Sequence, residues 1–410
     1  MDWNRHLGSG VTRPLAAMTT LLRQTHMAPP DLLPRAVAEA AAHLGAQATV
    51  YLADYTQSVL VPMPPPDAGR PPDLTIDGTL AGRAYRMMVA QSSTTDDEPV
   101  LWMPIIDGLE RLGVLKIVVV DPGTLEDRAF RRQCWWFSHY LGHLVSVLDM
   151  FGDAIDAVRR RHPRSLSAEL IWQLLPPLTS GTDKVLVSGR LEPSSSVGGD
   201  VFDYALSDDV AQFAILDATG HDLHSGLAAA SALAAYRNAR RQGHGLFEQT
   251  ESIHRTIRDE FGGRMYATGV LGRLDLHSGR LRYLSAGHPP PLLLRGGRVV
   301  KTLDAGLRPL LGLDMREATI AEEDLEPDDV IVLFTDGITE ARDQEHQFFG
   351  VDRLVDFVER EASEGIPLPE LVRRVCRRIL DYQNGVLQDD ATMLLVQWTT
   401  TGQAYLEPTR

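Results

Sequence analysis

Acidic residues stand at the ends of four hydrophobic, strand-like runs in the second half of this chain. Asp200 follows a Gly-Gly turn at the start of one run, and Asp217 closes the next. A third run leads straight into Asp336, and the pair Asp389-Asp390 stands immediately before the last run. The fold therefore has to accommodate several strand ends that carry carboxylates. We expect these carboxylates to meet around metal ions.

The runs between residues 184 and 398 are joined by turns typical of hairpins. Ser207-Asp-Asp, His277-Ser-Gly-Arg280 and Arg295-Gly-Gly-Arg298 each connect two runs directly, which favours antiparallel pairing. The strands are too many for one buried parallel sheet, so we expect an α+β fold with two antiparallel sheets packed face to face and helices outside. The expected strands are 184–191, 201–206, 210–217, 268–276, 280–286, 291–295, 298–303, 329–335 and 391–398, and the expected helices are 223–242, 246–261, 351–363 and 368–382.

A different order of elements precedes this region. Helical spacing at 31–44 and 80–89 alternates with strand-like runs at 49–53, 100–106 and 112–120. The Pro-rich stretch 62–72 excludes regular structure and reads as a loop. Over about residues 30–122 this order resembles a GAF sensory domain, which implies an N-terminal α/β domain, 1–124, that binds a small ligand or mediates dimers. No ligand signature accompanies the resemblance.

Residues 125–165 separate the two regions as a helical linker. Apolar side chains recur at three- and four-residue steps from Phe130 to Val158. A signalling helix that pairs with a second copy of the chain fits this stripe and predicts a homodimer. Packing of the stripe against its own chain is the alternative. Residues 166–400 then form the C-terminal domain.

Charge and cysteine content narrow the possible partners and location. The net charge of −15 argues against a nucleic-acid partner, because phosphate repulsion would have to be offset. The two cysteines, Cys134 and Cys376, cannot form a zinc cage or a disulfide framework. The N-terminus lacks the pattern of a signal peptide, and the longest apolar runs are too short to span a bilayer. We therefore expect a cytoplasmic protein without a membrane partner.

The residue types at the strand ends point to divalent cations. Carboxylate oxygens are hard ligands suited to magnesium or manganese, and four converging carboxylates without a cation would repel one another. A single Asp-Gly is usually a turn, but the four motifs together favour a metal site. Two ions about 3.5–4 Å apart can share a carboxylate and a water and bind a phosphoryl oxygen. The sequence contains no Walker loop, Gly-x-Ser-x-Gly motif or Cys-centred nucleophile, so attack by metal-bound water is favoured.

Six short motifs in the C-terminal region carry a family resemblance. Residues 184–398 resemble the metal-dependent protein phosphatases of type 2C, in their bacterial SpoIIE/RsbU-like branch, and Ser167 to Pro176 resembles the short helix that precedes this core. The matching segments are Glu192-Pro-Ser-Ser-Ser-Val-Gly-Gly-Asp200, Asp217-Ala-Thr-Gly-His221, Ser285-Ala-Gly-His-Pro-Pro-Pro-Leu292, Leu311-Gly312, Phe334-Thr-Asp-Gly-Ile-Thr-Glu-Ala341 and Gln388-Asp-Asp-Ala-Thr392. The resemblance implies an αββα sandwich with two Mn²⁺ or Mg²⁺ ions at one edge.

The resemblance also implies a role for each motif residue. Asp217 matches the bridging ligand, the backbone carbonyl of Ala218 a ligand of one ion, and Asp200 a ligand of the other side, partly through water. Asp336 and Asp389 match direct ligands, and these four aspartates would act in catalysis through metal-bound water. Supporting positions are Gly199, Gly337 and Asp390. His221 is either a proton donor to the leaving oxygen or a structural residue, and His288 is interpreted as shaping the nearby loop.

Two departures from the family pattern leave these carboxylates in place. The usual Gly-Asp-Phe-Tyr-Asp reads Gly199-Asp-Val-Phe-Asp203 here, and Asp222 stands where a glycine commonly follows Gly-His. The implied activity is hydrolysis of phosphoserine or phosphothreonine on a regulatory protein, typically an anti-sigma factor antagonist of the STAS type, under control of the N-terminal domain. The alternatives are an inactive module that binds a phosphoprotein and a phosphohydrolase that acts on small molecules.

Overall fold

The chain divides into two compact units between His162 and Pro163. The structure is a computed structural model that describes residues 12–94, 98–192, 198–220, 222–313 and 317–399. Each unit has its own sheets and its own hydrophobic core. Among the described residues, no helix combines the length and the apolar character that crossing a membrane requires.

The N-terminal unit is built on one antiparallel sheet of order β3-β2-β1-β6-β5-β4. Its strands are β1 (Ala46–Ala53), β2 (Val59–Met63), β3 (Leu74–Thr75), β4 (Gln91–Ser93), β5 (Val100–Asp107) and β6 (Glu110–Val119). Its helices are α1 (Thr12–Thr25), α2 (Leu33–Ala42), α3 (Leu80–Met87), α4 (Arg128–Asp149) and α5 (Asp153–Arg159). The likeness to GAF domains stays a prediction.

One strand of this unit runs into the Pro-rich stretch that was expected to form a loop. β2 contains Pro62, which lies opposite Tyr51 of β1. On its other side β2 pairs with the two-residue strand β3 only through Val59 and Leu60. Pro62 therefore lies beyond the end of β3, where no neighbouring strand needs the N–H that proline lacks. The expectation of a loop from residue 62 onward was wrong for the first two residues.

The predicted linker 125–162 is divided in the structure. α4 ends at Asp149, and α5 begins at Asp153 after the extended residue Gly152. The apolar stripe of α4 is buried in the core of the N-terminal unit, through Phe130, Phe137, Leu141, Val145 and Leu148. The stripe therefore packs against its own chain, which was the alternative that the sequence left open. Other apolar residues of the segment, Trp136, Val147, Met150 and Phe151, are exposed.

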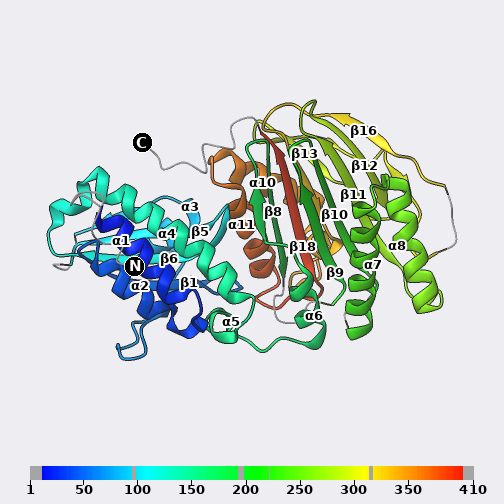
Figure 1. Ribbon diagram of the computed structural model, residues 1–410. Helices are drawn as coiled ribbons and strands as arrows, with labels where there is room; N and C mark the ends of the chain where they lie inside the picture. Colours follow the sequence, from blue (N-terminus) through cyan, green and yellow to red (C-terminus); the bar gives the residue numbers. More distant parts are fainter. Residues whose placement is uncertain (1–11, 95–97, 193–197, 221, 314–316, 400–410) are drawn as a thin grey trace. The chain divides into compact units, whose positions relative to one another are not determined.

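The C-terminal unit contains two six-stranded sheets with helices on their outer faces (Figure 1). One sheet has the order β15-β12-β11-β10-β9, with β16 paired to β12, and the other has the order β14-β13-β17-β18-β8-β7. All the pairings are antiparallel except that of β12 with β15. The strands are β7 (Thr179–Gly181), β8 (Val185–Glu192), β9 (Asp200–Leu206), β10 (Val210–Ala218), β11 (Ala267–Asp275), β12 (Arg280–Ala286), β13 (Leu292–Arg295), β14 (Arg298–Thr302), β15 (Leu307–Arg308), β16 (Ala321–Asp324), β17 (Val330–Phe334) and β18 (Ala391–Trp398).

Alternating side chains on β18 separate two cores. Leu394 and Val396 join the core that contains the other sheet, whereas Met393 and Leu395 join the core under α10 and α11. This is the two-residue period of a strand buried on both faces. Helices α7 and α8 lie over β10 and β11 on the opposite side (Figure 1). The predicted α+β fold of face-to-face sheets is confirmed. The helices of this unit are α6 (Leu166–Leu174), α7 (Leu223–Arg241), α8 (Leu246–Phe261), α9 (Asp336–Thr339), α10 (Gly350–Ser363) and α11 (Leu368–Tyr382).

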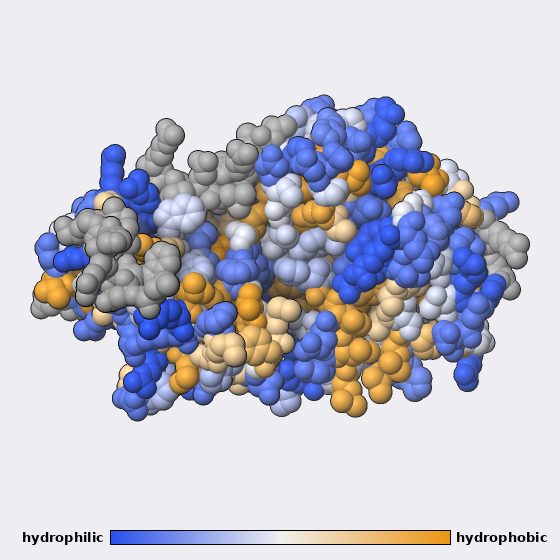
Figure 2. All heavy atoms as spheres, viewed as in Figure 1, coloured by the Kyte–Doolittle hydropathy of each residue, from blue (hydrophilic) through white to orange (hydrophobic). Residues whose placement is uncertain are grey.

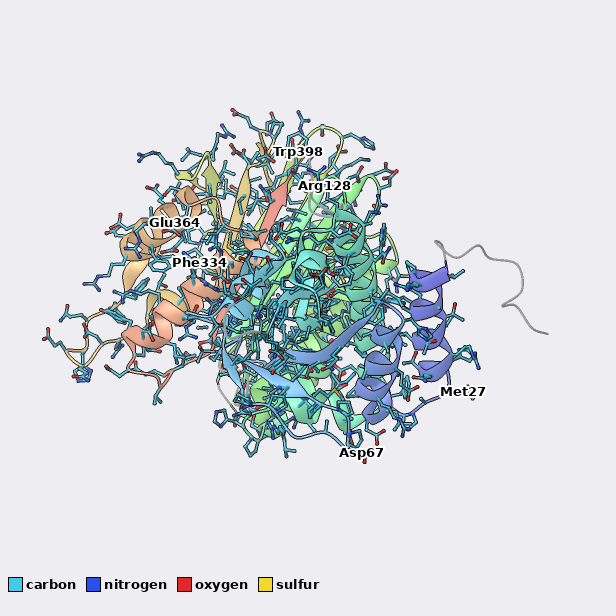
Figure 3. The ribbon with its side chains drawn as sticks, turned by 90° about the vertical axis from the view of Figure 1, so that its left-hand side faces the viewer. Met27, Asp67, Arg128, Phe334, Glu364 and Trp398 are labelled. Atoms are coloured by element: carbon cyan, nitrogen blue, oxygen red, sulfur yellow. The ribbon has the colours of Figure 1, made fainter. Side chains whose placement is uncertain are left out.

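The two ends of the sandwich are held differently. Phe334 ends β17 and Trp398 ends β18; since these strands are antiparallel, the two residues mark opposite ends of their sheet (Figure 3). At the Trp398 end, the buried indole Nε1 donates a hydrogen bond to the carbonyl oxygen of Leu276, 3.1 Å away and directly after β11 of the other sheet. At the Phe334 end, the links between the sheets are made by carboxylates and hydroxyls.

Candidate metal centre

Asp200 and Asp217 face each other across a strand pair. Asp200 is the first residue of β9 and Asp217 the penultimate residue of β10, and the two are direct partners in the antiparallel register. Directly opposite residues have their Cβ atoms about 4.5–5.5 Å apart. Asp200 is buried and Asp217 is partly exposed. The structure thus brings together the two carboxylates that sixteen intervening residues separate in sequence.

Asp336 and Asp389-Asp390 reach the same edge from the second sheet. Asp336 begins α9 directly after β17, and Asp390 precedes β18. The register pairs Phe334 with Met393, so the end of β17 lies beside the start of β18. The hydroxyl of Thr335 donates to Asp200 Oδ2 at 2.8 Å and accepts from the Thr392 N–H at 3.0 Å. Thr335 therefore connects the carboxylate of one sheet to the backbone of the other.

Asp390 fixes the Gly-Gly turn that precedes Asp200. Its Oδ2 accepts hydrogen bonds from the backbone N–H groups of Gly198 (2.7 Å) and Gly199 (2.8 Å). Bonds from N–H groups to an ionised carboxylate are among the stronger hydrogen bonds in proteins. The neighbouring Asp389 is exposed, and its Oδ1 accepts from the Asp390 N–H at 2.9 Å. The two adjacent aspartates thus differ: Asp390 holds the turn, while Asp389 is open to solvent and available to a ligand.

Two glycines permit the close backbone packing at this edge. A Cβ on Gly199 would lie 2.2 Å from the carbonyl oxygen of Ala218, and a Cβ on Gly337 would lie 1.8 Å from the carbonyl oxygen of Asp390. Both distances are well inside van der Waals contact, and both obstacles are backbone atoms. Only glycine fits at either position without displacing the segments that carry the acidic residues.

The carboxylates repel one another. Burial, together with the charges of Asp336, Asp389 and Asp390, raises the pKa of Asp217 to about 7. Burial also raises the pKa of Asp390 to about 6, although the N–H groups of Gly198 and Gly199 oppose the rise. The pKa of Asp200 is raised well above its ordinary value by burial and then by Asp217. Like charges that are forced together in this way are relieved by a cation.

The donor set fits hard divalent cations. Every acidic side chain at the edge offers carboxylate oxygens, which magnesium and manganese prefer. Within the described part of the chain, no three His, Cys, Asp or Glu side chains stand close enough to share one ion. The fit therefore rests on the chemistry of the donors and on their mutual repulsion. The roles predicted for Asp200, Asp217, Ala218, Asp336 and Asp389 stay predictions.

The structure describes only one of the two histidines that the motifs contain. His221 lies outside the described residues. His288 is buried, and its Nδ1 lies 2.7 Å from the hydroxyl of Thr268, the residue opposite Asp217 in the register. Burial lowers the pKa of His288 to about 3, so the ring is neutral. These contacts fit the prediction that His288 shapes the structure near the site rather than binding a metal.

The sequence did not predict the contacts of Asp203, the last residue of the Gly199–Asp203 motif. Its carboxylate is buried and accepts from Arg237 Nη2 at 2.7 Å and Arg240 Nη1 at 2.8 Å, both on α7. Arg237 Nη2 also donates to the carbonyl oxygen of Leu174 at the end of α6, at 2.7 Å. The motif therefore places its first aspartate at the acidic edge and uses its last one to join β9, α7 and α6.

Comparison with known proteins places the C-terminal unit among phosphatase relatives. Residues 207–399 match the sequence model of a family described as Stage II sporulation protein E (SpoIIE). The chain is 24% identical over 208 residues to the phosphoserine phosphatase RsbU of Bacillus subtilis, which covers 50% of this chain and 61% of that protein. It is 26% identical over 161 residues to the phosphoserine phosphatase RsbP of the same organism, with 38% and 40% covered.

Similar solved structures were found as well. The crystal structure of the RsbU and RsbW domains of a Mycobacterium tuberculosis protein is 25% identical, has a TM-score of 0.46, and covers 53% of this chain and 62% of that one. The chain spans less than two thirds of the length of the two curated relatives named above.

Proposed function

We propose that this protein is a metal-dependent protein serine/threonine phosphatase, because residues 207–399 match the SpoIIE family model and the chain is similar to the phosphoserine phosphatase RsbU. The observation that carries the proposal is the acidic edge itself. Asp200 and Asp217 are register partners, and the charges of Asp336, Asp389 and Asp390 all raise the pKa of Asp217. The reaction is hydrolysis of a phosphoserine or phosphothreonine monoester.

Asp200, Asp217, Asp336 and Asp389 would hold two Mn²⁺ or Mg²⁺ ions, with the Ala218 carbonyl as a further ligand. When bound, such ions lower the pKa of water and neutralise charge on a phosphoryl oxygen. The protein's own groups position the ligands. Thr335 fixes Asp200 through a 2.8 Å hydrogen bond, and Asp390 holds the Gly198-Gly199 turn, so the carboxylates are held in place before a substrate arrives.

We further propose that the substrate is a protein, an anti-sigma factor antagonist of the STAS type. Exposed apolar side chains support a macromolecular partner: Leu166 at the start of α6, and Leu223 and Leu227 in the first turns of α7, are 74%, 41% and 44% exposed. Figure 2 shows hydrophobic residues gathered where these two helices lie. Contiguous exposed apolar surface marks sites of protein interaction, and α7 begins only six residues after Asp217.

Phosphate release tests the proposed reaction. The full-length protein with Mn²⁺ is expected to release phosphate from an aryl phosphate and from a phosphoserine peptide. Addition of a chelator should reduce release to background, and restoring excess Mn²⁺ should recover it, because the carboxylates need the cation to form a working site. Release that is unaffected by the chelator would contradict the proposed metal dependence. No release with any divalent cation would contradict the phosphatase proposal and favour an inactive binding module.

Regulation by the N-terminal unit, and a homodimer formed through 125–162, are proposed as well. The exposed side chains of Trp136, Val147 and Phe151 in this segment offer apolar surface to a second copy. Removing residues 1–160 is expected to change the rate of phosphate release and to convert a dimer into a monomer, measured by enzyme assay and light scattering. Unchanged kinetics together with an unchanged molar mass would refute both ideas.

A further inference from the structure

A pocket of about 450 Å³ opens beside the acidic edge. One wall comes from the segment that follows β10, and the other from the end of α8 and the loop after it. The lining residues are Thr219, Gly220, Asp222, His224, Phe261, Arg264 and Met265. None of these residues is a proposed metal ligand, so the pocket is separate from the candidate metal centre.

Strand pairing fixes the pocket next to Asp217. Asp217 and Ala218 pair with Thr268 and Ala267 in the β10–β11 ladder. The backbone continues this pairing beyond the strands: the Thr219 N–H donates to the Tyr266 carbonyl at 3.1 Å, and the Tyr266 N–H donates to the Thr219 hydroxyl at 3.2 Å. The two walls are thus direct extensions of the strand ends that carry the site.

The two walls of the pocket differ in the charged groups that they offer to a ligand. The Asp222 carboxylate is engaged, because its Oδ1 accepts from the N–H groups of His224 (2.9 Å) and Ser225 (3.1 Å) as the cap of α7. Asp259, close to the other wall, is paired with Arg258 at 3.0 Å. Arg264 is exposed, and its guanidinium has no hydrogen-bond or ion-pair partner among the residues that the structure describes. It is a permanent cation on a chain of net charge −15.

We infer that this pocket binds an acidic side chain of the phosphoprotein substrate through Arg264, an inference that rests on the proposed phosphatase activity. Arg264 precedes Ala267, the partner of Ala218, by three residues, which is about 10 Å of extended chain. An extended substrate covers that distance in about three residues. The acid therefore stands about three residues from the phosphorylated one. Phe261 and Met265 provide apolar contacts for the methylene groups of that side chain, and Arg264 is a specificity residue.

Three synthetic phosphoserine peptides test the inference. They differ only at the positions two and three residues from the phosphoserine, which hold glutamate, glutamine or lysine. With Mn²⁺, the wild-type protein is expected to prefer the glutamate peptide to the lysine peptide by about five- to tenfold in kcat/KM, the range of one exposed charge pair exchanged for a repulsive one. In Arg264→Glu the ratio should invert. Because the ratio compares two peptides with the same variant, a general change in that variant's activity does not affect it.

A matched variant separates the local effect from the overall charge. Arg273 is also exposed and lies on β11, on the far side of Ala267 from the pocket, so Arg273→Glu should keep the wild-type ratio. An aryl phosphate serves as the probe of the reaction itself. If the wild type hydrolyses the aryl phosphate but shows no preference among the peptides, or if Arg264→Glu keeps the wild-type preference, the pocket inference is overturned. If the aryl phosphate is not hydrolysed, the proposed function fails, and the inference with it.

Discussion

Asp217→Asn is expected to lower the rate of phosphate release with Mn²⁺ by at least about 100-fold. Asp217 lies opposite Asp200, and the charges of Asp336, Asp389 and Asp390 all act on it, so its loss removes the carboxylate most central to the cluster. Bound metal ions contribute several kcal/mol of charge stabilisation in the transition state, and each 1.36 kcal/mol corresponds to a factor of ten. The assay is single-substrate kinetics at saturating Mn²⁺.

The same substitution is expected to stabilise the folded protein when metal is absent, although it lowers the rate of phosphate release. The pKa of Asp217 is raised to about 7, so the folded protein disfavours the charged carboxylate at pH 8. Asn at this position removes one member of a repelling group and is expected to raise the unfolding temperature of the metal-free protein, while abolishing most of the rise that Mn²⁺ gives the wild type.

Asp208 provides the control for both measurements. It lies at the other end of β10, in the β9–β10 turn, and its side chain is 90% exposed. Asp208→Asn changes the charge by the same amount but leaves the acidic edge intact, so activity and the Mn²⁺-dependent rise in unfolding temperature should both match wild type. Equal activity of Asp217→Asn and Asp208→Asn would contradict the proposed role of Asp217.

Gly337→Ala is expected to destabilise the protein by about 2–3 kcal/mol and to impair phosphate release. The added Cβ would stand 1.8 Å from the carbonyl oxygen of Asp390, and inserting a group into packed structure costs about 1–3 kcal/mol. Relief requires the Asp390-Ala391 backbone to move, which disturbs the carboxylate that holds the Gly198-Gly199 turn. Chemical denaturation and the phosphate assay measure the two effects.

Gly69→Ala is the matched control for this substitution. A Cβ at Gly69 meets nothing within 4 Å, and its φ is not in the left-handed region. The free energy of unfolding should therefore change little, and activity should be that of wild type. A Gly337→Ala protein as stable and active as Gly69→Ala would show that the acidic edge tolerates displacement of Asp390, contrary to the packing described above.

The sequence predicted the long elements of the C-terminal unit to within one or two residues. Runs such as 391–398 are mostly apolar and follow a turn, and both faces of β18 are indeed buried. The short strands β7, β15 and β16 were missed. Thr179–Gly181 and Leu307–Arg308 have too few residues to show a period, so only their pairing with neighbouring strands identifies them. α1 was missed because its periodicity is weak.

The acidic residues of the candidate site were predictable, and the resemblance implied Gly199, Gly337 and Asp390 as supports, but the contacts that these supports make were not predictable. Carboxylates after apolar runs are visible in sequence, whereas the bond from Thr335 to Asp200 joins residues from two sheets. The same holds for Asp390, whose partners Gly198 and Gly199 lie far away along the chain. The pocket with Arg264 combines residues of the Asp217–His221 motif with a second segment, 261–265, that shows no motif. In each case the information lies in the packing of the sheets and not in any local pattern.

The position of β18 has a consequence for the order in which the protein can be made. β18 pairs with both β8 and β17 in the middle of its sheet, yet the ribosome delivers it after all the other strands that the structure describes. Until residues 391–398 emerge, β8 and β17 expose unpaired edges, and the Gly198-Gly199 turn lacks Asp390. Folding of this unit is therefore governed by a contact between distant parts of the chain, which slows it. If the proposed function holds, a nascent chain is expected to show no phosphatase activity until this unit has been synthesised through β18.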